Sequence, residues 1–313
     1  MEAGHQGCRH QAPVRPAASD GTPRRLAYPQ SIPYPARIIM LLTSSPWLHE
    51  RSWTSVQEYL KHDDLILVPI GATEQHGRHT PLMVDTGWAI AVAEGAALAT
   101  GTLVAPPQHV GWSPHHLAYC GALTFRPETL ISVMVDIGES LIHHGFRKIV
   151  FVNGNRIANL PPMEIAAAKL RFSTGAYVSV VDAGLIARRE VGKICQAGEN
   201  GHGGDSETSF MLHWRPDLVD MSQAAPGKPH QTGGSFPTNP MPYQPPFDQN
   251  VISVRITAEE MLRGHESGIS GDATVADADK GRRVLEAIVR NTARHIEEAR
   301  RLKPEVRRPP IPI

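Results

Sequence analysis

The sequence lacks three features that mark common classes of protein. Its 31 Lys and Arg residues balance 31 Asp and Glu residues, so no net field draws the chain to nucleic acid or to an anionic membrane. Its three cysteines are widely spaced and form no CxxC pair, which argues against a disulfide framework and a thiolate zinc site. No uninterrupted apolar run approaches the roughly 18 residues that span a bilayer. We therefore expect a cytoplasmic protein whose partner is a small-molecule substrate, with no nucleic acid and no membrane bound.

The start of the chain differs in composition from the rest. Residues 1–39 hold six prolines and five arginines with almost no apolar periodicity, and such a segment cannot bury enough surface to offset its ordering entropy. The Arg24-Arg25 pair suggests a twin-arginine export signal, but Leu-Ala-Tyr-Pro follows where an apolar stretch is required. We expect a flexible arm over 1–39. Since 313 residues allow one large domain, we expect a single domain over 40–313.

Apolar runs alternate with helical patterns along the rest of the chain. The expected strands are residues 65–70, 103–105, 148–152, 177–182 and 251–256. The expected helices are residues 54–61, 86–100, 127–144, 163–172, 206–213 and 277–302. This order predicts an α/β fold, a three-layer α-β-α sandwich whose mainly parallel sheet is covered by helices on both faces.

Local signals predict several helix ends. Thr54 with Gln57 three residues later has the pattern of a capping box, so a short helix is expected to start there. Gly101 and Gly145 follow helical patterns and are expected to end them as C′ residues. Segment 216–250 is rich in Pro and Gly and too long for a simple connection, so we expect a lid, an oligomer arm or a wall of the site.

A dense group of polar side chains follows the expected strand 65–70. The stretch GATEQHGRHTPLMVD contains Glu74, His76 and Asp85, and loops at the carboxyl ends of parallel strands commonly form ligand sites. Glu74 and His76 are two residues apart, so an extended backbone points both to one side. The three side chains can therefore converge on a metal ion. Each also has an ordinary interpretation: Asp85 as a helix N-cap, and Glu74 and His76 as parts of a solvated loop.

Further segments carry side chains of the same kind. HGGDSETS supplies His202 and Glu207, and Asn153-Gly154-Asn155 follows the expected strand 148–152. Together with TEQHG and the following Asp85, with SPHH, and with the late SGDAT segment, these motifs resemble the creatininase family of metal-dependent amidohydrolases. The resemblance covers about residues 65–288.

The resemblance implies a dinuclear metal centre. Glu74, His76 and Asp85 would bind the metals, with Asp85 as the bridging ligand. The HGGDSETS segment would supply an active-site histidine, His202, and a carboxylate beside the metals, Glu207. The expected cofactors are one or two divalent ions per chain, of Zn, Mn or Fe.

The chain departs from the family at Asn155. The family commonly has Asn-Gly-His where this sequence has Asn-Gly-Asn, so the usual imidazole ligand is replaced by an amide. Asn155 could bind a cation through its oxygen, or it could cap the following helix. Arg156 comes next and could pair with a substrate carboxylate or stand in solvent.

The expected reaction is hydrolysis of a C–N amide bond in a small cyclic or formylated amide, through a metal-bound hydroxide. His202 is expected to donate the proton to the leaving nitrogen. His116 is the second candidate, with a wall histidine as its ordinary interpretation. Two other functions remain open: a metal-dependent lyase or isomerase on the same scaffold, and a non-catalytic metal-binding protein. The family's ring-like assemblies imply a homo-oligomer, expected to be a hexamer.

Overall fold

A parallel sheet forms the centre of the computed structural model, which describes residues 45–195, 200–227, 257–264 and 266–308. Within these ranges, four parallel strands form one sheet in the order β2-β1-β3-β4. The strands are β1 (Leu65–Ile70), β2 (Leu103–Val104), β3 (Lys148–Asn153) and β4 (Tyr177–Asp182). The predicted arm 1–39, the predicted strand 251–256 and most of segment 216–250 lie outside the described residues.

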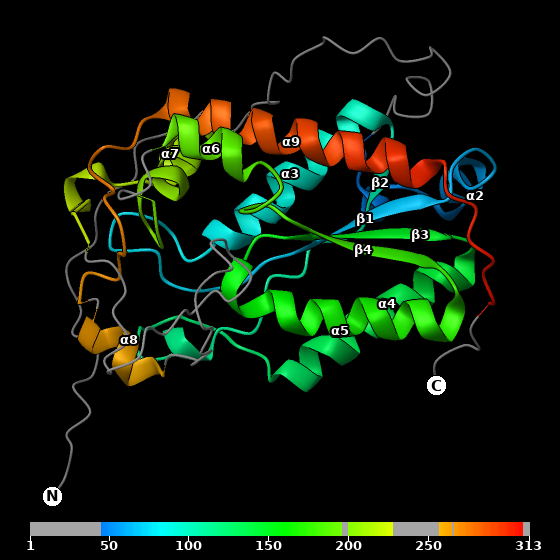
Figure 1. Cartoon of the computed structure of the whole chain (residues 1–313), viewed down its shortest axis with the longest axis horizontal. Coiled ribbons are helices and arrows are strands. Elements are labelled where there is room, and N and C mark those ends of the chain that lie inside the picture. The colour runs from blue at the N-terminus through cyan, green and yellow to red at the C-terminus, as the bar shows by residue number, and fades with distance from the viewer. Residues whose placement is uncertain (1–44, 196–199, 228–256, 265, 309–313) are drawn as a thin grey trace, which may run out of the picture.

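Long helices cover both faces of this sheet. On one face lie α3 (Val84–Thr100) and α9 (Ala278–Arg300), and on the other lie α4 (Pro127–His144) and α5 (Arg156–Thr174) (Figure 1). This arrangement is the three-layer α-β-α sandwich predicted from the sequence.

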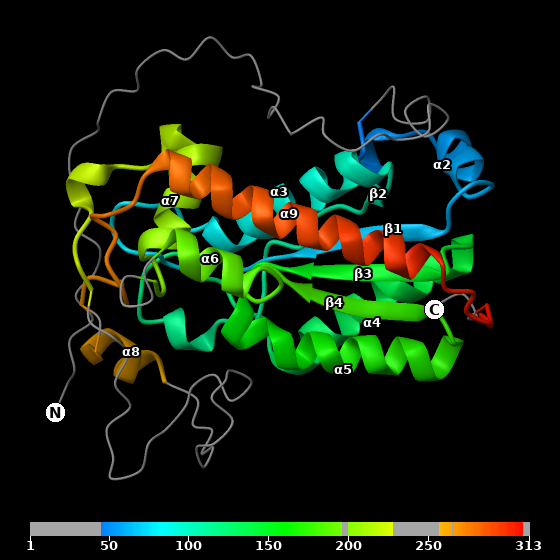
Figure 2. The same cartoon turned by 45° about the horizontal axis from the view of Figure 1, so that its top comes forward.

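The described residues also form several shorter helices. The α-helices are α2 (Trp53–Tyr59), α6 (Arg188–Ile194), α7 (Asp205–Trp214) and α8 (Ala258–Gly264). The 3-10 helices are η1 (Leu48–Glu50), η2 (Pro114–His116), η3 (Pro216–Leu218) and η4 (Met221–Gln223). Helices α6 and α7 pack against α9 (Figure 2). No helix in the described part of the chain combines the length and the apolar character that crossing a membrane requires.

Alternate residues of β1 enter two separate cores. Leu65 and Leu67 pack with residues of α3 and α9. Ile66, Val68 and Ile70 pack with residues of α4 and α5. Every residue of β1 is buried because helices cover both faces of the sheet, and this explains why the strand is a continuous apolar run in the sequence.

The start of α2 differs from the prediction. Ser52 is its N-cap, and the Ser52 side chain accepts a hydrogen bond from the Ser55 N–H at 3.3 Å. The predicted start at Thr54 is therefore wrong, because the neighbouring Ser52 offers the same capping chemistry one turn before Ser55. The predicted C′ glycines are confirmed, since Gly101 and Gly145 have left-handed φ values of 70° and 114°.

The start of α5 also differs. The helix begins at Arg156 rather than at residue 163, and it continues through Pro161 and Pro162. An interior proline costs a helix about 3 kcal/mol, which is why the sequence pattern places a break there. Packing of α5 on α4 and β4 and a side-chain cap from Asn155 offset this cost. Helix α6 was not expected from the sequence.

The chain leaves β1 and β3 toward opposite faces of the sheet. After β1 it passes through α3 to β2, and after β3 it passes through α5 to β4. The two connecting helices lie on opposite faces (Figure 1), so the loops diverge above the carboxyl ends of β1 and β3. Open α/β sheets bind their ligands at such a switch point.

Gly154, directly after β3, allows α3 to approach the sheet. A Cβ atom at this position would lie 1.9 Å from the Asp85 carbonyl oxygen and 3.1 Å from the Ala89 nitrogen. Gly154→Ala is therefore expected to lower the free energy of unfolding by about 1–3 kcal/mol, as overpacking does. Chemical denaturation measures the loss. The control is Gly192→Ala in α6, where nothing lies within 4 Å of the added Cβ and a gain of up to about 1 kcal/mol is expected. A Gly154→Ala variant with a free energy of unfolding as high as that of Gly192→Ala would contradict this role of Gly154.

Candidate functional site

The predicted site residues meet at the carboxyl ends of β1 and β3. Glu74 and His76 lie in the loop after β1, and Asn155 is the second residue after β3. Asp85 lies inside the first turn of α3, whose N-cap position is held by Met83 without a side-chain cap. The interpretation of Asp85 as an N-cap is therefore wrong. Its carboxylate accepts a hydrogen bond from the Asn155 amide instead.

His76 lies at the centre of the cluster. Its Nδ1 is 3.2 Å from the Glu74 backbone oxygen, and since a carbonyl only accepts, Nδ1 carries the proton. Its Nε2 is 3.2 Å from Asp85 Oδ1 and 3.6 Å from Glu207 Oε2. This Nε2 is buried and has no hydrogen-bond partner in the described structure. A histidine held by a backbone carbonyl at one nitrogen, with the other nitrogen facing carboxylates, has the tautomer of a metal ligand.

The ionisable groups of the cluster favour a bound positive charge. Burial, with the Asp85 carboxylate beside it, raises the pKa of Glu74 well above its usual range. Burial also raises the pKa of Glu207. Burial alone would lower the pKa of His76, but the carboxylates of Asp85 and Glu207 raise it to about 10. Three crowded carboxylates thus stabilise a positive charge between them.

The donor atoms match a divalent ion. Glu74, His76 and Asp85 each offer one ligand atom within 4.8 Å of the others, and so do His76, His202 and Glu207. Carboxylate oxygens with imidazole nitrogens suit borderline ions such as zinc, manganese and iron(II). Together with the unpartnered His76 Nε2, this donor set fits the expected metal.

Asn155 lies between two candidate ligands. Its Nδ2 donates to Glu74 Oε2 at 2.8 Å and to Asp85 Oδ2 at 3.0 Å. Its Oδ1 accepts from the Ala158 N–H at 3.1 Å and so caps α5. This geometry favours the cap interpretation, because the amide faces the carboxylates with its donor nitrogen. The role of Asn155 as a metal ligand stays a prediction.

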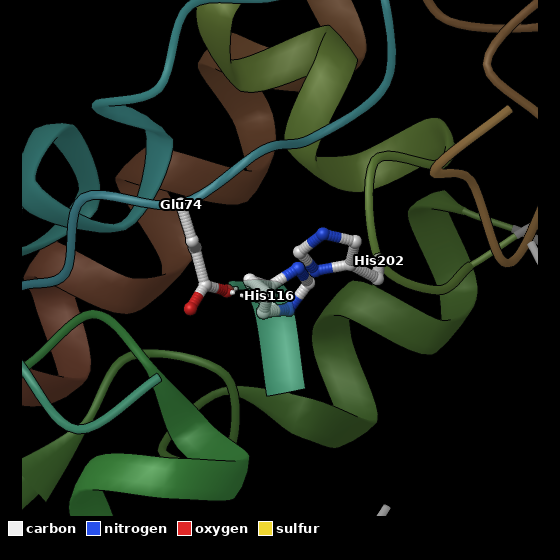
Figure 3. Close-up of side chains that lie close together, drawn as sticks. All are labelled: Glu74, His116 and His202. Carbon is white, nitrogen blue, oxygen red and sulfur yellow. Dashed lines mark ion pairs between the residues drawn. The ribbon is translucent and has the colours of Figure 1, made fainter. Parts of the chain in front are cut away.

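His202 approaches Glu74 from the segment before α7 (Figure 3). Its Nε2 lies 2.5 Å from the Gln75 carbonyl oxygen, so Nε2 carries the proton. The other nitrogen, Nδ1, is 3.8 Å from Glu74 Oε1. Burial, with the charge of His76, lowers the pKa of His202 well below its usual range. Neutral His202 therefore presents Nδ1 as a proton acceptor at the cluster.

His116 contacts the same carboxylate from η2 (Figure 3). The Gln75 side chain is oriented by the Gly77 N–H, which donates to Gln75 Oε1 at 2.8 Å. The Gln75 Nε2 then lies 3.2 Å from His116 Nδ1 and donates to it. The proton of neutral His116 is consequently on Nε2, which faces Glu74 Oε1 at 3.3 Å.

Gln75 is a site residue that the sequence reasoning missed. Its backbone oxygen orients His202, and its amide orients His116. An extended backbone would point Gln75 away from its neighbours Glu74 and His76, so the pattern gave no reason to select it. The second histidine of the GATEQHGRHTPLMVD stretch, His79, forms a hydrogen bond with Thr208 Oγ1 at 2.8 Å and belongs to none of the candidate metal groups of the described residues.

All residues predicted for the site thus lie in one network. The structure brings together Glu74, His76, Asp85, His116, Asn155, His202 and Glu207 through the contacts given above. Their individual roles stay predictions.

Known proteins resemble this chain over most of its length. The family model for creatinine amidohydrolase matches residues 49–296. A mycofactocin precursor peptide peptidase from Mycolicibacterium smegmatis is 32% identical over 240 residues, covering 74% of this chain and 84% of the relative. A 3-dehydro-scyllo-inosose hydrolase from Thermotoga maritima is 27% identical, covering 75% of this chain and 77% of the relative.

Solved structures share the fold. A mutant creatininase of the Zn-Zn type matches with a TM-score of 0.67 at 26% identity, covering 83% of this chain and 100% of its own. A manganese creatininase matches with a TM-score of 0.67 at 25% identity and the same coverage. The family model spans far more than half of the chain, and the geometry of the cluster agrees with the motifs. The chain therefore belongs to the creatininase family of hydrolases.

Proposed function

We propose that this protein is a metal-dependent amidohydrolase that cleaves a non-peptide C–N bond in a small cyclic or formylated amide. The observation that carries the proposal is the buried His76 Nε2, which has no hydrogen-bond partner among the described residues and faces Asp85 and Glu207. The carboxylates beside this nitrogen favour a positive charge there, and a bound divalent cation would supply that charge and take up the nitrogen lone pair.

Three residues would hold the first ion: His76, Asp85 and Glu207. Glu74 and Asp85 face the second position, where Asn155 now donates to both of them. A bound divalent ion supplies two effects, a lowered pKa of water and a polarised carbonyl. The backbone carbonyl of Glu74 holds His76 in the ligand tautomer, and the Gly203 N–H donates to Glu207 Oε2 at 2.7 Å. Both contacts orient ligands before a metal arrives.

His202 is the proposed proton carrier. With Nε2–H bound to the Gln75 carbonyl, only Nδ1 can take up a proton and pass it to the leaving nitrogen. Glu74 Oε1 lies on that side of the ring at 3.8 Å and stabilises the protonated form. His116 donates its Nε2–H toward the same oxygen, which keeps Glu74 in place during the transfer.

Metal content tests the proposal first. The purified protein is expected to carry at least one equivalent of Zn, Mn or Fe, and chelation is expected to lower the melting temperature, because an ion that binds only the folded state stabilises it by mass action. Elemental analysis and thermal melts before and after chelation measure both effects. A metal content below about a tenth of an equivalent per chain, with no divalent ion restoring stability or activity, would refute the proposal.

Substrate screening tests the reaction. A panel of lactams, hydantoins and formamides is expected to release an amine or a carboxylate. Short peptides form a second arm, because a 32% identical relative is a peptidase. Elimination or isomerisation without release of an acid would favour the lyase or isomerase alternative, and stoichiometric metal without turnover would favour the non-catalytic one. The expected homo-oligomer stays a prediction that light scattering can test.

A further inference from the structure

Arg156 lies beside the candidate metal centre. It is the first residue of α5 and follows Asn155, whose amide contacts Glu74 and Asp85. Its side chain is half-buried. Burial raises the pKa of Asp182, and the nearby Arg156 charge acts against this effect. The guanidinium therefore lies near the end of β4, on the residue that follows Asn155.

Gly184 leaves room for this side chain. A Cβ atom at Gly184 would lie 3.3 Å from Arg156 Cδ and 3.6 Å from Arg156 Nη1. The same point is 3.3 Å from Asp182 Oδ1, a buried oxygen without a hydrogen-bond partner in the described structure. The arginine side chain and the Asp182 carboxylate thus approach one another at a position where any larger residue would crowd both.

The guanidinium keeps its donors available. Within the described ranges, no hydrogen bond or ion pair engages Arg156. A guanidinium presents five N–H donors in a planar fork that matches a carboxylate with two parallel hydrogen bonds. It also supplies a fixed positive charge on the residue after Asn155, whose amide contacts Glu74 and Asp85, so a substrate anion would meet a positive charge beside these carboxylates.

We propose that Arg156 binds a carboxylate of the substrate, so that the amide cleaved by this protein is an acid rather than a neutral molecule. The inference rests on the proposed amidohydrolase function and narrows its substrate class to carboxylate-bearing cyclic or formylated amides. The carboxylate can belong to a lactam or to a formylated amino acid. Both present the same two oxygens to the guanidinium fork of Arg156.

Matched pairs of probes test this assignment by binding. N-formylalanine is compared with N-formylalaninamide, and pyroglutamate with pyroglutamamide, on the protein as purified, by calorimetric titration. Wild type is expected to bind at least one acid about 10- to 100-fold more tightly than its amide, the range of a charge-assisted pair. Arg156→Gln is expected to abolish this preference. Arg156→Lys is expected to keep part of it, because an ammonium lacks the fork.

Lys169→Gln is the matched control. Lys169 is exposed on the same helix, about 20 Å further along at 1.5 Å per residue, and its loss removes the same charge. This variant is expected to keep the full preference. Melting curves of all variants check that the fold is intact.

The outcomes separate the inference from the function on which it rests. Equal binding of acid and amide by wild type, no binding of either, or a preference that survives in Arg156→Gln would overturn the role of Arg156. Hydrolysis is measured in parallel on the same probes and on the neutral panel. Acid-selective binding without cleavage of any amide would refute the amidohydrolase proposal alone, whereas cleavage without acid preference would refute only the Arg156 assignment.

Discussion

Glu74→Gln and Asp85→Asn are each expected to lower kcat by at least about a hundredfold while the protein stays folded. Each change removes the charge of a proposed metal ligand at nearly constant side-chain size. A catalytic ion contributes several kcal/mol to the transition state, and each ~1.4 kcal/mol is tenfold in rate. Turnover of the amide identified in the screen, with metal content and melting temperature measured beside it, checks the result. Metal content is expected to fall with kcat.

The fold itself should survive these changes. Burial raises the pKa of the Glu74 carboxyl well above its usual range, so its charged form destabilises the metal-free protein at neutral pH, and loss of that charge removes the penalty. Exposed carboxylates on α4 provide the controls, Glu128→Gln and Asp136→Asn, and both should retain wild-type turnover. Unfolding of Glu74→Gln or Asp85→Asn would indicate a structural role instead. Turnover and metal content near wild type would remove both residues from the ligand set.

Wild-type protein is expected to bind one ion tightly and a second more weakly, and Asn155→His is expected to raise the affinity of the second ion by about tenfold or more. The proposed first ion would bind among His76, Asp85 and Glu207, which lie together without any contact from Asn155. The proposed second ion would bind between Glu74 and Asp85, where the Asn155 amide now donates hydrogen bonds to both carboxylates. An imidazole at position 155 would replace the amide donors by a nitrogen lone pair that can bind the ion. A tenfold gain in ion affinity corresponds to about 1.4 kcal/mol of binding free energy. Calorimetric titration of the metal-free protein measures both ions.

Asn155→Ala is the control for this comparison. It removes the amide donors without adding a ligand, at a cost of about 1 kcal/mol for the lost helix cap. If the second ion gains as much affinity in Asn155→Ala as in Asn155→His, the gain comes from freeing the carboxylates rather than from the imidazole. Two equally tight sites in wild type, or no change in Asn155→His, would mean that His202 already acts as the missing ligand. Its assignment as proton carrier would then have to be given up.

Local patterns were sufficient to predict most of the sheet. The strand at 65–70 is apolar throughout because both of its faces are covered, and a pattern of that kind can be recognised without knowing the partners. Gly101 and Gly145 could be predicted as helix ends because a left-handed residue there needs only its own backbone freedom. The start of α5 could not, because Pro161 is a break by local rules and only packing makes the longer helix stable.

The sequence by itself determined the family, the layered fold and the residues of the candidate metal site, since each depends on chemistry or periodicity within short segments. Only the tertiary structure decided how those residues act on one another. Asn155 donates to Glu74 across 81 positions of the chain, and Gln75 orients His202 across 127 positions. Such contacts leave no periodic signal, because the distance between two loops at the end of a sheet is set by strand order and register rather than by either loop's own sequence.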